Sequence, residues 1–153
     1  METTAIYDKE TKEFIVNTPT PLAQNTGITN GACHAHHIVV FSQLYIDGVN
    51  QGIHGVLVPI RDKNLNVMPG VQIHDMGHKM GLNGVDNAKF FFENVRVPRE
   101  NLLNLSSDVA EDGSYTTKLK VASEIVSLQW LINFSLVVSV YPACPKVLLY
   151  YSG

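Results

Sequence analysis

Residues 77–103 read GHKMGLNGVDNAKFFFENVRVPRENLL, and this stretch decides the fold class of the chain. Its first part holds three glycines and three Asn or Asp residues, types that accept positive φ angles or hydrogen-bond their own backbone. An apolar run from Lys89 to Val97 follows at once, and Pro98 ends it because proline cannot donate to a sheet ladder. The stretch therefore predicts a turn-rich polar loop that leads into a buried β-strand.

The preceding part of the chain repeats this pattern of short apolar runs separated by turn residues. Runs at Thr3–Tyr7 and Glu13–Asn17 flank a polar turn, which predicts a β-hairpin. A longer pair, 38–46 and 53–60, flanks the turn Asp47–Gly52. Strands at intervals of roughly ten residues indicate a barrel or sandwich rather than alternating strands and helices. The predicted fold class is mainly β, a small antiparallel β-barrel or sandwich.

Three segments lack the strand pattern. Residues 24–37 are small and polar, and we expect a loop with exposed backbone amides there. Pro98–Leu103 is predicted to open one helical turn. The hydrophilic residues 104–120 are typical of a connecting loop.

The composition changes after Lys120, where residues 121–153 hold one acid, Glu124, and one base, Lys146. The density of Ile, Leu, Val and Phe over 125–140 predicts an apolar helix that another surface has to cover. A membrane span is the alternative for this C-terminal apolar helical tail. Polar residues inside the run and the lack of flanking basic clusters argue against a span.

The composition also excludes classes of function. The net charge of −3 offers no basic surface for nucleic acid. Two cysteines, Cys33 and Cys144, are too few for a disulfide framework and favour a reducing compartment. We find neither a secretory signal at the first residues nor a Ser-Lys-Leu peroxisomal address at the last.

Four segments, taken in order and spacing, resemble one family. They are Tyr7-Asp8-x-x-Thr11-x-Glu13-Phe14-Ile15-Val16-Asn17-Thr18-Pro19, then Gln51-Gly52-Ile53-His54-Gly55 leading to Val58-Pro59-Ile60-Arg61-Asp62, then residues 77–87, and then Arg96-Val97-Pro98-Arg99-Glu100-Asn101-Leu102-Leu103. Over about residues 2–120 the chain resembles the middle β-domain of plant-type peroxisomal acyl-coenzyme A oxidases. The resemblance implies a middle β-domain at 1–104, a connecting loop at 105–120, and a tail at 121–153 that is not family-like.

The resemblance also implies a function. Enzymes of this family bind FAD and convert an acyl-CoA and O2 into a 2-enoyl-CoA and hydrogen peroxide in peroxisomal fatty-acid β-oxidation. A glutamate of their C-terminal helices removes the α-proton, and the full-length enzymes are expected to be homodimers. We expect this chain to be a fragment without that base, so no catalytic residue is assigned and the chain alone is expected to be inactive. The alternative is a non-catalytic β-domain remnant that acts in subunit association or is tethered to a membrane by its tail.

The resemblance places one loop against the flavin. The family usually carries Trp-x-Gly-Gly there, and related dehydrogenases carry Trp-Ile-Thr-Asn, where this chain has Gly27-Ile28-Thr29-Asn30-Gly31. It implies Ile28, Thr29, Asn30 and Gly31 as cofactor-binding residues, with Thr29 bonding the flavin through its hydroxyl and amide. Gly27 stands in the tryptophan position, which removes an aromatic wall. A flexible polar loop without a cofactor is the competing interpretation.

Other polar side chains receive structural interpretations. On a strand His34 and His36 would face away from His37, so we predict no metal site. We expect His54, His74 and His78 to be surface or hydrogen-bonded residues, Asn83, Asp86 and Asn87 to bond their own loop, and Lys79 and Arg99 to be solvated. Phe90, Phe91 and Phe92 alternate along a strand, so both faces of that strand should be covered.

Overall fold

The structure is a computed structural model, and it describes residues 2–81, 83–104 and 107–117. Ten strands and two short 3₁₀ helices make up this described part. In chain order they are β1 (Thr4–Asp8), β2 (Glu13–Asn17), η1 (Pro21–Ala23), β3 (Asn25–Thr29), β4 (His37–Ile46), β5 (Val49–Pro59), β6 (Val71–Asp75), β7 (Asn87–Phe92), β8 (Val95–Pro98), η2 (Arg99–Asn101), β9 (Ser107–Val109) and β10 (Tyr115–Thr117).

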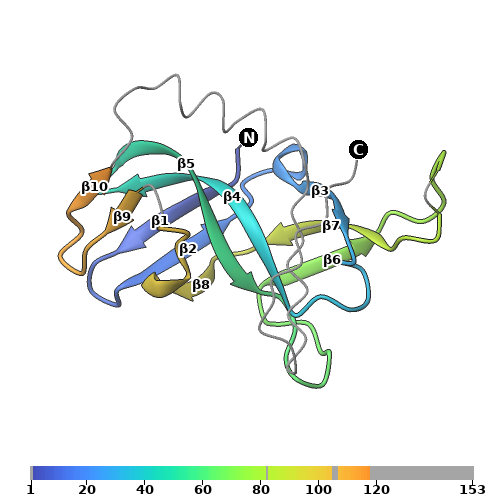
Figure 1. The fold of residues 1–153 in the computed structure, drawn as a ribbon. Coiled ribbons are helices and arrows are strands. Elements are labelled where there is room, and N and C mark those ends of the chain that lie inside the picture. Colours follow the sequence, from blue (N-terminus) through green and yellow to red (C-terminus); the bar gives the residue numbers. More distant parts are fainter. Residues whose placement is uncertain (1, 82, 105–106, 118–153) are drawn as a thin grey trace.

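The larger sheet has the strand order β5-β4-β1-β2-β8 (Figure 1). β1 and β2 form the predicted hairpin, and β4 and β5 form the predicted long pair. The turn between β4 and β5 is shorter than expected, since only Asp47 and Gly48 separate the strands, both with positive φ. β1 runs parallel to β4, so the prediction of a purely antiparallel sheet is wrong at this pair. The long connection from β2 through β3 returns the chain in the direction of β1.

The smaller sheet has the order β3-β7-β6. Residues 24–37 were expected to form a loop, but Asn25–Thr29 form a strand that pairs with β7. Ile28 is buried in the core, and β3 takes the edge of β7 that β6 leaves unpaired. The single strand expected over Lys89–Val97 is also divided. β7 ends at Phe92 and β8 begins at Val95, and a positive φ at Asn94 turns the chain from one sheet into the other.

One hydrophobic core joins the two larger sheets. Its fully buried side chains include Phe14 from β2, Ile38 and Leu44 from β4, and Phe90 and Phe92 from β7. The rings of Phe90 and Phe92 stack at 6.3 Å on the core side of β7. On its other face Phe91 is half-buried and meets the ring of His74 edge-on at 5.8 Å. Both faces of this strand were expected to be covered. The face with Phe90 and Phe92 is fully covered, and the face with Phe91 is partly covered.

The described strands do not close into a barrel, which corrects that part of the predicted fold. Their ladders form three separate sheets, and β5 and β8 remain the edges of the larger one. A single backbone bond, from Thr18 N–H to the Phe92 carbonyl at 2.8 Å, ties the end of β2 to the end of β7. Because the chain turns at Asn94, β7 and β8 cannot continue as one strand across both sheets. The sheets therefore share a core without sharing a ladder.

The region expected to be a connecting loop contains the hairpin β9–β10. This hairpin is joined to the larger sheet, because Tyr7 Oη donates to the Glu111 carbonyl at 3.2 Å and Lys12 pairs with the Glu111 carboxylate. The helical turn predicted at Pro98–Leu103 is present as η2. The predicted tail at 121–153 and its helix at 125–140 lie outside the described residues. Within the described part, no helix is long and apolar enough to cross a membrane.

Candidate cofactor-binding loop

The residues predicted to bind a cofactor lie where β3 passes into residues 30–36, here called the site loop. Gly27 has a φ of 73°, and a bulge lies between Asn25 and Ile28 in the pairing of β3 with β7. Asn30 has a φ of 58°, a left-handed conformation that asparagine tolerates better than most residues. Its carbonyl accepts a hydrogen bond from Ala35 N–H at 3.0 Å, which closes the site loop on itself.

The four predicted cofactor-binding residues differ in what they can offer. Ile28 is 6% exposed and belongs to the core, so only its backbone could meet a ligand. Gly31 is buried beneath the Phe90 ring. Thr29 and Asn30 are half-buried, and their side chains hydrogen-bond to no residue that the structure describes. The free polar groups of this segment are therefore the Thr29 hydroxyl and the Asn30 amide.

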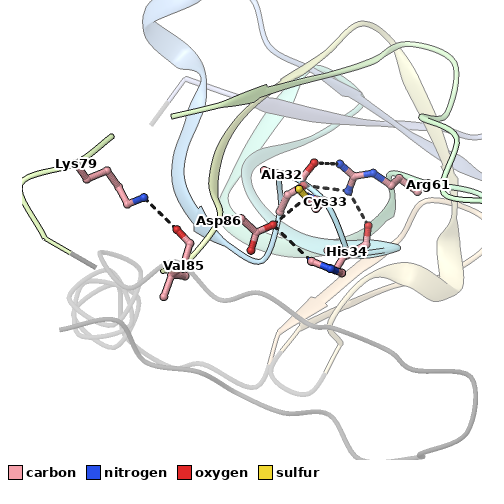
Figure 2. A network of polar contacts seen from close by, with 9 residues as sticks. Ala32, Cys33, His34, Arg61, Lys79, Val85 and Asp86 are labelled. Carbon is pink, nitrogen blue, oxygen red and sulfur yellow. Dashed lines mark hydrogen bonds and ion pairs between the residues drawn. The ribbon is translucent and has the colours of Figure 1, made fainter. Parts of the chain in front are cut away.

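Arg61 lies under the site loop and holds its carbonyls (Figure 2). Arg61 comes two residues after the end of β5 and is 6% exposed. Nη1 donates to the carbonyls of Gly31 and Ala35, each at 2.9 Å, and Nη2 donates to the carbonyl of Ala32 at 2.5 Å. Burial lowers the pKa of Arg61 from its ordinary value, and the nearby Cys33 and Asp86 oppose that shift. The guanidinium stays protonated at neutral pH, so a buried cation organises the loop.

Asp86 holds the site loop from the other side. Its Oδ2 accepts the Cys33 N–H at 2.9 Å and lies 3.8 Å from His34 Nδ1 (Figure 2). The expectation that Asp86 bonds its own loop is therefore wrong. The pairing of Asn87 with Thr29 at the start of β7 is the reason, because it brings the preceding residue against the site loop.

The loop before β7 confirms one structural interpretation and corrects another. Asn83 bonds its own loop as expected, since its Oδ1 accepts Lys79 N–H at 2.7 Å and its Nδ2 donates to the Lys79 carbonyl at 3.0 Å. Lys79 was expected to be solvated, but its Nζ donates to the Val85 carbonyl at 3.0 Å. Arg99 likewise donates to the Val109 carbonyl at 2.9 Å. Both basic side chains serve the backbone of their own region.

The histidines take separate positions. His54 is hydrogen-bonded as expected, with Nδ1 3.2 Å from the Gly52 carbonyl and Nε2 3.1 Å from Tyr115 Oη. His37 opens β4, and burial, together with the charge of His36, lowers its pKa. In the part of the chain that the structure describes, no three His, Cys, Asp or Glu side chains come together as a metal site.

Sequence reasoning missed the roles of Arg61 and Asp86 at this loop. Each lies far from its partners along the chain, 30 residues for the bond from Arg61 to Gly31 and 53 for the bond from Cys33 to Asp86. The available signal was an arginine placed directly after a long apolar strand. That position indicates a side chain near the core, but it does not reveal which carbonyls it reaches.

Comparisons with known proteins show what this chain is similar to. No protein-family model matches it. The peroxisomal acyl-coenzyme A oxidase 3 of Arabidopsis thaliana is 50% identical over 120 residues, which cover 78% of this chain and 18% of that relative. The crystal structure of Caenorhabditis elegans acyl-CoA oxidase-1, complexed with FAD and ATP, matches with a TM-score of 0.75 at 42% identity, covering 76% of this chain and 18% of that one. Acyl-CoA oxidase-2 of the same organism, bound with FAD, ascaroside-CoA and ATP, matches with a TM-score of 0.74 at 37% identity, again covering 76% and 18%.

These matches extend over most of the described residues and agree in sequence and in fold. The chain spans 18% of the length of its Arabidopsis relative. Over that segment the chain is similar to acyl-coenzyme A oxidases both in sequence and in fold.

Proposed function

We propose that this chain supplies the β-domain of a FAD-dependent acyl-CoA oxidase of peroxisomal fatty-acid β-oxidation. The reaction takes an acyl-CoA and O2 to a 2-enoyl-CoA and hydrogen peroxide. Two hydrogens leave the α- and β-carbons of the acyl chain, and both end on dioxygen. The 50% identity to an enzyme named as peroxisomal supports both the reaction and the location. On this proposal the β-domain includes residues 1–104, and the family's homodimer would be its assembly.

The site loop carries the proposal of a FAD contact. Thr29, at the end of β3, and Asn30, at the start of the site loop, present a hydroxyl and an amide that no described residue occupies, just before the Gly31 carbonyl that Arg61 holds. Such a donor and acceptor set fits the polar edge of a flavin ring. When bound, FAD would accept a hydride from the acyl β-carbon and pass the electrons to O2. The chain's own contribution is to hold the ring edge through Thr29 and Asn30.

We also propose that the chain alone does not turn over an acyl-CoA. Oxidation of the thioester needs a base for the α-proton. Asp86 is a carboxylate at the site loop, and it is engaged by the Cys33 N–H. No described residue is assigned as the base, in keeping with the family resemblance, which places that glutamate on helices beyond the β-domain.

A titration of the purified full chain with FAD tests the cofactor role. Flavin fluorescence should report binding to the wild-type chain, and Thr29→Ala and Asn30→Ala should each weaken it. Thr116→Ala is the matched control, because Thr116 is exposed on β10, which lies at the left of Figure 1, whereas β3 lies right of centre. Equal FAD affinity in the two site variants and the wild type would contradict the assignment.

A peroxide assay tests the activity of the chain by itself. With FAD and a saturated long-chain acyl-CoA, a peroxidase-coupled assay should show no hydrogen peroxide above the background without protein. Peroxide added to the same mixture should be recovered in full, which controls for its destruction. Sustained peroxide formation that requires both FAD and acyl-CoA would refute the proposal that the base lies elsewhere.

A second candidate function is a non-catalytic role in subunit association. Two large apolar side chains support it, since Leu22 is 91% exposed and Met80, in the loop before β7, is fully exposed. A contiguous apolar patch marks a site of protein contact, so this role requires the two side chains to belong to one such patch. Size-exclusion chromatography with light scattering should then give a dimer or larger species. A monomer at all protein concentrations would exclude this role, and a vesicle-flotation assay would test the alternative of a membrane tether.

A further inference from the structure

We infer that Arg61 and Asp86 are positioning residues, which hold the site loop in the one conformation that leaves Thr29 and Asn30 free to meet a cofactor. The link to cofactor binding rests on the proposed function, but the role of Arg61 and Asp86 in holding the site loop does not. Neither side chain has to touch the cofactor. Each acts through the backbone of residues 31–35.

The guanidinium of Arg61 matches the curled backbone of the site loop. Its planar fork carries five N–H donors in fixed directions. Three hydrogen bonds from Nη1 and Nη2 reach the carbonyls of Gly31, Ala32 and Ala35, so five consecutive residues curve around one cation. A lysine ammonium is a point charge at the end of a flexible stem and cannot reproduce this fork. The geometry therefore selects arginine.

Arg61 is itself fixed by the central sheet. His37 of β4 pairs with Pro59 of β5 just before it. The His36 carbonyl accepts both Ile60 N–H, at 2.8 Å, and Arg61 N–H, at 3.2 Å. The backbone N–H of Arg61 thus bonds His36, the last residue of the site loop, while its side chain bonds the carbonyls of earlier residues in the loop. The loop is anchored to β4 and β5 as well as to β3.

Asp86 completes the arrangement with the opposite charge and the opposite backbone group. Arg61 takes carbonyls of the loop, and Asp86 takes the Cys33 N–H that lies between them in sequence. Figure 2 shows the two side chains on either side of Ala32 and Cys33. The Ala32 carbonyl and the Cys33 N–H belong to one peptide unit, which is thus held from two sides, so its rotation breaks a charge-assisted bond.

The test uses the full chain without flavin and measures amide hydrogen exchange across residues 31–35. Arg61→Ala should accelerate exchange there by about tenfold or more, since it removes three charge-assisted hydrogen bonds. Ethylguanidinium at low millimolar concentration should restore slow exchange in that variant, and ethylammonium, with equal charge but no fork, should not. Arg61→Lys should exchange nearly as fast as Arg61→Ala. Arg96→Ala, which removes an exposed arginine from β8, is the matched control and should leave the loop unchanged.

Two further variants and a second readout keep the inference testable. If Arg61→Ala fails to fold, Arg61→Lys and Asp86→Asn provide the same comparison with smaller changes in volume. The rate at which the exposed Cys33 thiol is alkylated should rise in Asp86→Asn, because its backbone is then held less firmly. Wild-type rates in all of these variants, or equal rescue by ethylammonium, would overturn the inference.

The measurement of FAD affinity separates this inference from the proposed function. If the wild-type chain binds FAD, Arg61→Ala should bind it at least tenfold more weakly, with recovery in ethylguanidinium. If FAD binds the wild type and Arg61→Ala equally well despite a loosened loop, the positioning role is refuted. If exchange follows the expected order but the wild type binds no FAD, the loop is held as inferred and the proposed cofactor function fails.

Discussion

Gly31→Ala is the change that most directly tests how the site loop packs on the core. A Cβ at this position would lie 2.7 and 2.8 Å from two carbons of the Phe90 ring and 3.1 Å from the Ile28 carbonyl oxygen. The ring contacts are 0.6–0.7 Å inside the 3.4 Å at which ordinary van der Waals contact begins. Gly31 does not have a positive φ, so the cost is steric and not conformational.

The magnitude depends on whether the Phe90 ring can move aside. Phe90 is fully buried and its ring is stacked on that of Phe92, a residue that is itself only 1% exposed, so little space is open to the Phe90 ring. Overpacking of a core costs about 1–3 kcal/mol, and a ring confined on both sides places Gly31→Ala in the upper half of that range. With a urea m-value of about 1–3 kcal/mol per molar, the unfolding midpoint should fall by roughly 1 M.

Urea titration followed by circular dichroism measures this shift. Gly81→Ala and Gly84→Ala are matched controls, because an added Cβ at either meets no atom within 4 Å. Their free energies of unfolding should stay within about 0.5 kcal/mol of the wild type. Phe90→Leu should relieve the clash, so the double variant with Gly31→Ala should lose less stability than the sum of the two single changes. A wild-type midpoint for Gly31→Ala, or strict additivity with Phe90→Leu, would refute the close packing of Gly31 against the Phe90 ring.

Two further predictions concern titratable side chains. Burial lowers the pKa of His54 below its ordinary 6.5, so near this pH the unfolded chain binds a proton that the folded chain does not. The free energy of unfolding should therefore fall as the pH drops below 6.5. His54→Gln should reduce this fall but not abolish it, because the pKa of His37 is lowered as well. Urea midpoints measured across this pH range check it, and an unchanged slope would contradict it. Arg96 lowers the pKa of Asp8 below 3.8, so the stabilisation from this carboxylate is present above pH 3.8 and is lost as the pH falls below it. Arg96→Ala should raise the Asp8 pKa, which an NMR titration measures. An unmoved pKa would show that the ion pair is not formed in solution.

The strands that could be predicted are those whose local signals and tertiary contacts agree. The hairpin β1–β2 and the long pair β4–β5 have apolar runs on both sides of clear turn residues. β3 could not be predicted, because Ile28 is the one large apolar residue in Asn25–Thr29 and the strand exists through its pairing with β7. The separation of β7 from β8 depends on the backbone angle of Asn94, and a short polar interruption in an apolar run does not reveal such a turn.

The candidate site divides in the same way. Thr29 and Asn30 could be named from resemblance, since the segment around them follows a recognisable pattern. What holds them could not, because Arg61 and Asp86 reach the site loop from remote parts of the chain. Asn83 was predictable for the opposite reason, as its partner Lys79 is four residues away. Sequence reasoning found the contacts of Asn83 within its own loop, but it missed the bond from Lys79 to Val85 in the same loop and the contacts between loops.

The strand order of the larger sheet has a consequence for the chain while it is still on the ribosome. β2 receives its outer neighbour only from Val95–Pro98, so its backbone stays an open edge until nearly the whole β-rich region has been translated. An open strand edge is a template for any other unpaired strand nearby. Closely spaced ribosomes on one messenger would therefore favour exchange of the β8 segment between neighbouring nascent chains.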